Sequence, residues 1–167
     1  MNHHAEYVSP GHPDRLADAI AESIVTAAVS QKPGALVGVE VAVHTDCVFV
    51  DGRIAAGAQS VDIEKIVRNV YRAAGYDGPW KPEPGKIRVT TEVCQEILSA
   101  EEADIRPFAD DQNIVIGYAC GDALTNYLPV AQWVSGELGR RLFAQIRSDQ
   151  NSALSSDQIS NCWRRWR

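Results

Sequence analysis

The sequence predicts an α+β fold in which helices pack on one largely antiparallel sheet. Two stretches carry apolar residues at every third or fourth position, as the buried stripe of a helix requires. Between them, residues 37–43 alternate valine with other residue types, which is the period of a half-buried strand. With 167 residues the chain is long enough for one domain. We expect this domain to span residues 1–147, followed by a disordered, serine-rich tail over 148–167.

The first predicted helix begins at Pro13 and ends before Pro33. Proline fits the first position of a helix because an N–H group there would have no partner within the helix. The strand at 37–43 follows, and its alternation places the valines on one face and Glu40 on the other. The apolar stripe of the helix comprises Leu16, Ala17, Ile20, Ile24, Val25 and Ala28.

Turn residues divide the next part of the chain. Thr45-Asp46 and Asp51-Gly52 are typical of tight turns. Residues 47–50 and 53–59 are therefore predicted to be two further strands of an antiparallel meander.

A second helix is expected to be capped by Asp62 and closed by Gly75. Residues 77–86 contain three prolines and two glycines and are predicted to form a loop. Residues 87–93 read as a strand, and residues 95–104 as a short helix or an acidic loop. The stripe of the second helix comprises Ile63, Ile66, Val67, Val70, Tyr71 and Ala74.

Two more elements are predicted towards the end of the chain. Residues 113–119 are almost wholly apolar, which favours a central strand. A last helix is expected over residues 129–147. Its inward face is predicted to comprise Val130, Trp133, Val134, Leu138, Leu142 and Ile146.

The charge of the chain argues against some classes of partner. A net charge of -6 and an isoelectric point near 5.2 do not suit a general binder of nucleic acid or anionic membranes, because a phosphate backbone selects for basic residues. No apolar run is long enough to cross a bilayer, and the first residues lack the apolar stretch of a signal peptide. We expect a cytoplasmic protein. The four cysteines form no C-x-x-C pair, so neither a zinc knuckle nor a disulfide framework is indicated.

The stretch "SPGHPDRLAD", residues 9–18, carries more than a helix start needs. A helix N-terminus attracts anions through its exposed N–H groups. Gly11 would let a phosphate approach the backbone, and the ring of His12 and the guanidinium of Arg15 would donate hydrogen bonds to it. Asp14 would hold a Mg²⁺ that shares the phosphate oxygens. The alternative from these residues alone is a capped helix with a tolerated histidine.

Five segments in order resemble the S-adenosylmethionine synthetase (methionine adenosyltransferase) family. "GHPDRLADAI" resembles its N-terminal GHPDK motif, and "GVEVAVHTDCVFVDGRI" resembles its strand-turn-strand segment with a central Glu. "VDIEKIVRNVYRAAGYD" is similar to the helix that follows in the family, "ADDQNIVIGYAC" to its GAGDQ strand, and "YLPVAQWVSGELGRRL" to the next helix. The resemblance implies the fold of the N-terminal domain of that family.

The resemblance also implies an activity. The family transfers the adenosyl group of ATP to the sulfur of L-methionine and releases pyrophosphate and phosphate, with Mg²⁺ and K⁺ as cofactors. By resemblance His12 contacts the triphosphate, Asp14 binds Mg²⁺ and Glu40 is associated with K⁺. Asp111 matches the acid at the junction of adenosyl group and methionine. Without the resemblance, Glu40 reads as a solvated strand carboxylate and Asp111 as a turn residue.

Two departures from the family pattern keep other functions open. At Arg53 the family usually has a Glu for the methionine ammonium group, and nothing nearby in the sequence obviously compensates the added positive charge. Family members are also considerably longer. We therefore keep three hypotheses: a synthetase that works as a homo-oligomer or paired with another synthetase-like chain; a catalytically silent member that binds nucleotide phosphate or pairs with a complete synthetase; and a small Mg²⁺-dependent phosphohydrolase using His12 and Asp14.

Overall fold

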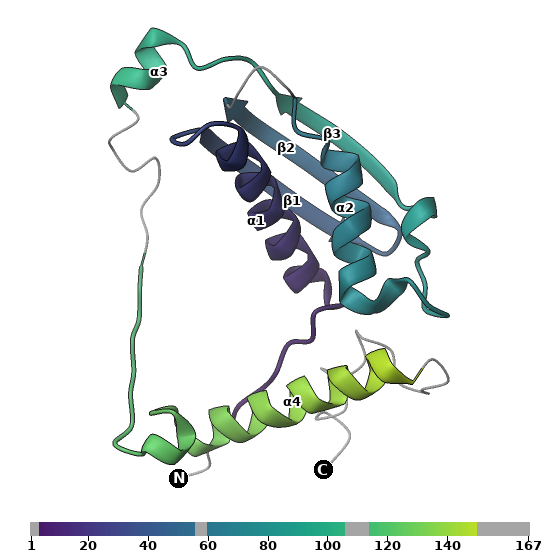
Figure 1. Cartoon of the computed structure of the whole chain (residues 1–167), viewed down its shortest axis with the longest axis vertical. Helices are drawn as coiled ribbons and strands as arrows, with labels where there is room; N and C mark the ends of the chain where they lie inside the picture. Colours follow the sequence, from purple (N-terminus) through teal and green to yellow (C-terminus); the bar gives the residue numbers. More distant parts are fainter. Residues whose placement is uncertain (1–3, 56–59, 106–113, 150–167) are drawn as a thin grey trace. The chain divides into compact units, whose positions relative to one another are not determined.

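A computed structural model describes residues 4–55, 60–105 and 114–149 of the chain (Figure 1). The chain divides into two compact units, one made of Pro13–Asp111 and the other of Met1–His12 with Gln112–Arg167. None of the helices in the described residues is long and apolar enough to cross a membrane. The domain boundary at 147 stays a prediction, and most of the predicted tail, residues 150–167, lies outside the described residues.

The Pro13–Asp111 unit is a layer of helices on one face of a three-stranded sheet. Helix α1 (Pro13–Gln31) leads into the hairpin of β1 (Leu36–His44) and β2 (Cys47–Ala55), and α2 (Ile63–Tyr71) then crosses to β3 (Arg88–Cys94). The strand order is β1-β2-β3, with β1 and β2 antiparallel and β2 and β3 parallel. Helices α1 and α2 lie on the same face of the sheet (Figure 1). The predicted α+β class is confirmed, and the sheet is mixed.

The core of this unit lies between the two helices and the valine face of the sheet. The predicted alternation of β1 is present, since its four valines pack against the core while Glu40 is exposed. In α1 the predicted stripe is buried except for Val25, which is 40% exposed, and Ala17, which is half-buried. The side chains that are at most 1% exposed are Ile20, Ile24, Ala28, Val48, Val50, Ala55, Val67 and Tyr71.

The boundaries of α2 follow from its capping residues, as predicted. The carboxylate of Asp62 accepts a hydrogen bond from the backbone N–H of Lys65 at 3.0 Å, which satisfies one of the unpaired donors of the first turn. At the other end the helix widens over Arg72–Tyr76, and Gly75 ends it with a φ of 105°. The predicted loop at 77–86 is confirmed, apart from a single 3₁₀ turn at Pro84–Lys86.

The prediction of a turn at Asp51-Gly52 was wrong, because β2 continues through both residues. Gly52 lies opposite Val39 in the β1–β2 register, with a φ of 120°. A Cβ atom at this position would lie 2.1 Å from the carbonyl oxygen of Gly38. Glycine is therefore present because two strand backbones approach closely, not because the chain reverses. The true reversal is at Thr45-Asp46, as predicted.

Helix α3 (Ala100–Ile105) resolves the ambiguity at residues 95–104 in favour of a short helix, preceded by an irregular segment after β3. The prediction of a central strand at 113–119 was wrong for its described part. Residues 114–119 have no regular structure, and the side chains of Ile114, Val115, Ile116 and Tyr118 are between 77% and 88% exposed. Apolar composition indicates burial only where a partner surface is present.

In the other unit, α4 (Val130–Ser148) has nearly the predicted bounds but a different buried face. Of the predicted inward residues Ile146 is buried, whereas Leu138 is 43% exposed. Ser135 and Gly139 are buried instead. A Cβ atom on Gly139 would lie 2.1 Å from the ring of Tyr7, so the N-terminal segment packs on the small residues of the helix. The predicted stripe members that are more than a third exposed are Val130, Val134, Leu138 and Leu142.

We predict that Gly52→Ala destabilises the fold much more than Gly34→Ala. Both glycines have a positive φ, but a Cβ on Gly34 meets nothing within 4 Å. The free energy of unfolding of Gly34→Ala should therefore fall only by the cost of the backbone conformation, about 1–2 kcal/mol. In Gly52→Ala the new Cβ also clashes with backbone atoms. Its free energy of unfolding should fall by more than about 3 kcal/mol, or the variant should fail to fold. Urea unfolding measures both, and equal losses would contradict the role given to the strand contact.

Candidate functional site

The residues singled out by the sequence lie in a turn and in the first turn of the helix that follows it. The backbone N–H of His12 donates to the carbonyl of Ser9 at 3.0 Å, which closes the turn. Gly11 is buried and His12 is half-buried, whereas Asp14 and Arg15 are exposed. The charged candidates at the start of α1 are therefore open to solvent, where a ligand can reach them.

The first turn of α1 has the electrostatics that an anion requires. Its leading backbone N–H groups carry partial positive charge, and Pro13 occupies the first position without removing a useful donor. The side chain of Leu16 is buried in the core, so the start of the helix is fixed relative to the sheet. Asp14 therefore projects from a rigid element.

Glu40 lies on the open face of the sheet, away from the helices. It stands opposite Asp51 in the β1–β2 register, and Asp51 stands opposite Glu92 in the β2–β3 register. The row brings three carboxyl-bearing residues side by side. Within the described residues, however, no three His, Cys, Asp or Glu side chains converge in a way that could hold a metal ion. A Mg²⁺ at Asp14 would depend on ligand oxygens for the rest of its coordination, which is a common arrangement for this ion.

The structure does not bring all the predicted site residues together. Helix α1 runs back along β1, so its first turn lies at the end of the sheet where the β1–β2 hairpin turns (Figure 1). Arg53 lies near the opposite end of β2. A helix of 19 residues spans about 28 Å, which sets the scale of the separation. Asp111 lies outside the described residues.

Arg53 is not an uncompensated charge, contrary to the expectation from the sequence. Its Nε and Nη2 donate to the two carboxylate oxygens of Glu102, both at 2.9 Å. Nη1 donates to the carbonyl of Glu96 at 2.9 Å and to the Sγ of Cys94 at 3.4 Å, and Nη2 also donates to the carbonyl of Ile97 at 3.2 Å. A guanidinium has five N–H groups, and all five are used.

Glu102 has a second role besides its pairing with Arg53. The backbone N–H of Ser99 donates to the Glu102 carboxylate at 2.8 Å, and the backbone N–H of Glu102 donates to the hydroxyl of Ser99 at 3.2 Å. This reciprocal pair is a capping box, which starts α3. The hydrogen bond from Arg53, followed by those from Ser99, lowers the pKa of Glu102 from 4.5 to about 2.

Sequence reasoning missed this cluster, although a signal was present. The "SAEE" at residues 99–102 has the S-x-x-E spacing of a capping box. The contact with Arg53 joins residues 49 positions apart and has no such local signature. The contacts of Gln95 could not be predicted from sequence either. Its side-chain amide pairs with the backbone N–H and carbonyl of Val61 at 2.7 and 3.2 Å.

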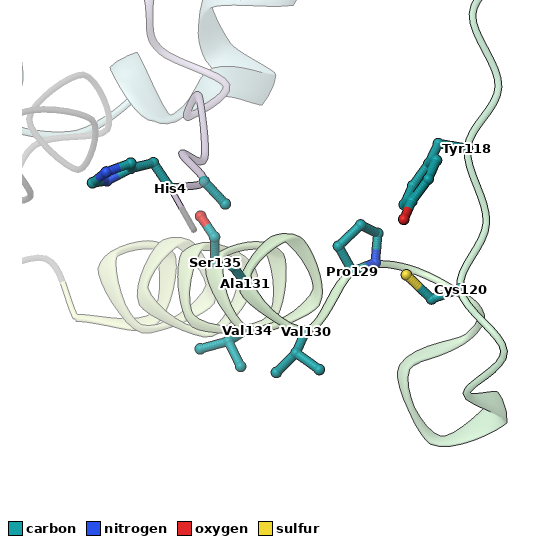
Figure 2. A pocket seen from close by; sticks show the side chains of 9 residues that line it. His4, Tyr118, Cys120, Pro129, Val130, Ala131, Val134 and Ser135 are labelled. Carbon is teal, nitrogen blue, oxygen red and sulfur yellow. The ribbon is translucent and has the colours of Figure 1, made fainter. Parts of the chain in front are cut away.

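The other unit contains a pocket of about 860 Å³ that does not coincide with the predicted site. Figure 2 shows Pro129, Val130 and Val134 at the start of α4 together with Tyr118 and Cys120 from the preceding segment. The lining is mostly apolar and includes no Asp, Glu, Lys or Arg side chain. Such a lining suits an apolar group rather than a metal-bound polyphosphate.

We predict that the Glu102 carboxyl titrates near pH 2 in the folded chain. Because pairing depresses this pKa, the stability that the pair contributes is fully present above pH 4.5 and is lost as the pH falls through about 2. A ¹³C NMR titration of the side chain measures the midpoint. The midpoint should return towards 4.5 in Arg53→Met, and a wild-type midpoint near 4.5 would contradict the pairing.

Comparisons with known proteins match the fold and the motifs described above. A family model described as S-adenosylmethionine synthetase, N-terminal domain, matches residues 1–102. The S-adenosylmethionine synthase of Prochlorococcus marinus (strain NATL1A) is 30% identical over 159 residues, and that of Mesoplasma florum is 34% identical over 145 residues. These matches cover 87% and 80% of this chain but only 38% and 36% of the relatives.

A solved structure agrees with the sequence matches. The structure of an unusual S-adenosylmethionine synthetase from Campylobacter jejuni has a TM-score of 0.72 and 26% sequence identity to this chain, and covers 86% of this chain and 37% of its own length. This chain thus spans well under half the length of the relatives it matches. The region matched by the family model, residues 1–102, includes the Gly11–Arg15 sequence and the whole β1–β2–β3 sheet. The chain belongs to the S-adenosylmethionine synthetase family, and it matches the N-terminal domain of that family.

Proposed function

We propose that this chain takes part in S-adenosylmethionine synthesis, the transfer of the adenosyl group of ATP to the sulfur of L-methionine with release of pyrophosphate and phosphate. The single observation that carries the proposal is the Gly11–Arg15 sequence, which leads into the exposed first turn of α1, within a region matched by the family model. Membership of the family supports the reaction class. The position of Asp14 and Arg15 in the first turn of α1 supports the use of the motif as a polyphosphate site.

The residues at the start of α1 have separate tasks in this proposal. The backbone N–H groups of the first turn and the guanidinium of Arg15 attract the triphosphate, and the ring of His12 donates a hydrogen bond to it. A Mg²⁺ held by Asp14 would supply electrostatic stabilisation of the charge that gathers on the leaving triphosphate. Donors fixed in advance around that charge lower the barrier because they need no reorganisation during the reaction.

The roles of Glu40 and Asp111 are proposed on the family resemblance. Glu40 would be the carboxylate associated with K⁺, and Asp111 would contact the junction of the adenosyl group and methionine. Glu40 lies on the open face of the sheet, whereas the start of α1 lies at one end of the helical layer. One small ligand does not readily bridge these positions within a single chain.

We therefore propose that the working form is an oligomer. A homo-oligomer, or a pair with another synthetase-like chain, would let the start of α1 in one chain meet the open sheet face of another. The cytoplasmic location expected from the sequence stays a prediction.

A second candidate function is favoured by Arg53. A guanidinium stands where the family usually has a Glu for the methionine ammonium group, and its five donors are all taken by residues of the same chain. This arrangement offers no carboxylate at position 53 for an ammonium group. It favours a catalytically silent member that binds nucleotide phosphate, alone or beside a complete synthetase.

We predict that the purified chain forms S-adenosylmethionine from ATP and methionine in the presence of Mg²⁺ and K⁺. His12→Ala should lower the rate by about 100-fold or more, which is the usual loss for one donor to developing negative charge. The matched control is His44→Ala, which removes another histidine, the exposed last residue of β1, to which the proposal gives no role, and which should leave the rate unchanged. The product is quantified by liquid chromatography, and its absence from the wild-type reaction would remove the synthetase function.

We predict Mg²⁺-dependent binding of a non-hydrolysable ATP analogue whether or not the transfer reaction occurs. Asp14→Asn should abolish the dependence on Mg²⁺ because it removes the carboxylate that would hold the ion. Asp18→Asn is the matched control, since Asp18 is also exposed and lies one turn along α1. Calorimetry measures both variants. Equal binding by the two variants would contradict the site, and phosphate release from tripolyphosphate without methionine would favour the phosphohydrolase.

A further inference from the structure

Residues 95–102, which we call the strap, are held by polar contacts rather than by the core. The strap leaves the end of β3 and leads into α3. None of the residues from Cys94 to Asp104 is buried, and Ile97 is 75% exposed. A segment without buried apolar side chains has no hydrophobic reason to stay in one position. Leu98 is half-buried and is not part of the core cluster, so the position of the strap comes mainly from hydrogen bonds and ion pairs.

Most of those contacts converge on one guanidinium. Arg53 binds the backbone of the strap at the carbonyls of Glu96 and Ile97 and binds its side chain at Glu102. The two-pronged contact with Glu102 is the stronger geometry for an arginine and a carboxylate. The Arg53 and Glu102 side chains are 24% and 27% exposed, so solvent screens the pair only in part.

The pairing of Glu102 with Arg53 also fixes the start of α3. The same carboxylate that pairs with Arg53 accepts the backbone N–H of Ser99 and so closes the capping box. Fixing the carboxylate therefore fixes the first turn of the helix. Gln95 provides a second attachment through its paired hydrogen bonds with Val61. The strap is thus fastened at its beginning and at its end.

We propose that Arg53 is a positioning residue that holds the strap in place beside the carboxyl ends of β2 and β3. The strap is held by residues of the chain itself, and no ligand is needed to order it. Loss of Arg53 opens the strap and leaves the helical layer in place, because the core residues of α1 and α2 make no use of this contact. This inference rests on contacts within one unit and is independent of the synthetase activity.

The test compares amide hydrogen exchange in the wild-type full chain and in Arg53→Met, which keeps most of the side-chain length without the charge. The backbone N–H groups of Ser99, Glu102 and Ala103 all donate hydrogen bonds and report on the strap. Their exchange should accelerate by about tenfold or more, the change expected from losing one charge-assisted hydrogen bond. The amides of α1 and α2 should keep their wild-type rates.

Two further variants separate positioning from general stability. Arg88→Met removes an arginine from β3 that pairs with Asp46 and does not contact the strap, so strap exchange should stay at the wild-type rate. Glu102→Gln should accelerate strap exchange, and adding Arg53→Met to it should have a smaller effect than in the wild type. The proposal is overturned if wild-type strap amides exchange as in a free peptide, if Arg53→Met changes them by less than twofold, or if it accelerates α1 and α2 equally.

Discussion

The one-sided burial of the β1–β2–β3 sheet is the constraint on which the rest of the main unit depends. Valines at alternate positions of β1, together with Val48 and Val50 of β2, give the sheet one apolar face, and α1 and α2 must both cover it. The other face carries mostly polar and small side chains, together with Phe49, which is 40% exposed. A βαβ crossover from β2 through α2 to β3 meets this requirement, because it returns the chain to the sheet without using the open face.

This constraint disperses the groups that carry chemistry. The start of α1 lies at the end of the unit where the β1–β2 hairpin turns, Arg53 lies near the other end, and Glu40 projects from the open face. Each position is rigid, since each belongs to a helix or strand tied to the core. The proposed oligomer would let groups from two chains combine these positions in one site. The strap closes one end of the sheet, and the helix start remains exposed at the other.

The periodic parts of the fold could be predicted from sequence, and the parts decided by distant contacts could not. Spacing of apolar residues and capping by Asp62 gave α1, α2 and β1 with nearly correct bounds. Asp51-Gly52 was mistaken for a turn because a glycine needed for close strand contact has the same sequence signature as a glycine in a reversal. Residues 114–119 and the stripe of α4 were predicted to be buried, yet the described residues place no surface over most of them.

In the candidate site, too, local features could be predicted from sequence and distant contacts could not. Gly11, His12, Asp14 and Arg15 were found from sequence because they lie in one short, continuous stretch of it. The neutralisation of Arg53 was not, because its partner Glu102 comes from a segment 49 residues away. Charge at one position of a sequence does not reveal whether the fold supplies the opposite charge.

The most direct test of this account is the distance between the two ends of the main unit. Nitroxide labels at positions 15 and 96 in a cysteine-free background can be measured by double electron–electron resonance. The lengths of α1 and β2 predict a separation of about 25 Å within one chain. A single population below about 15 Å would place the helix start beside the strap and contradict the separation on which the account depends.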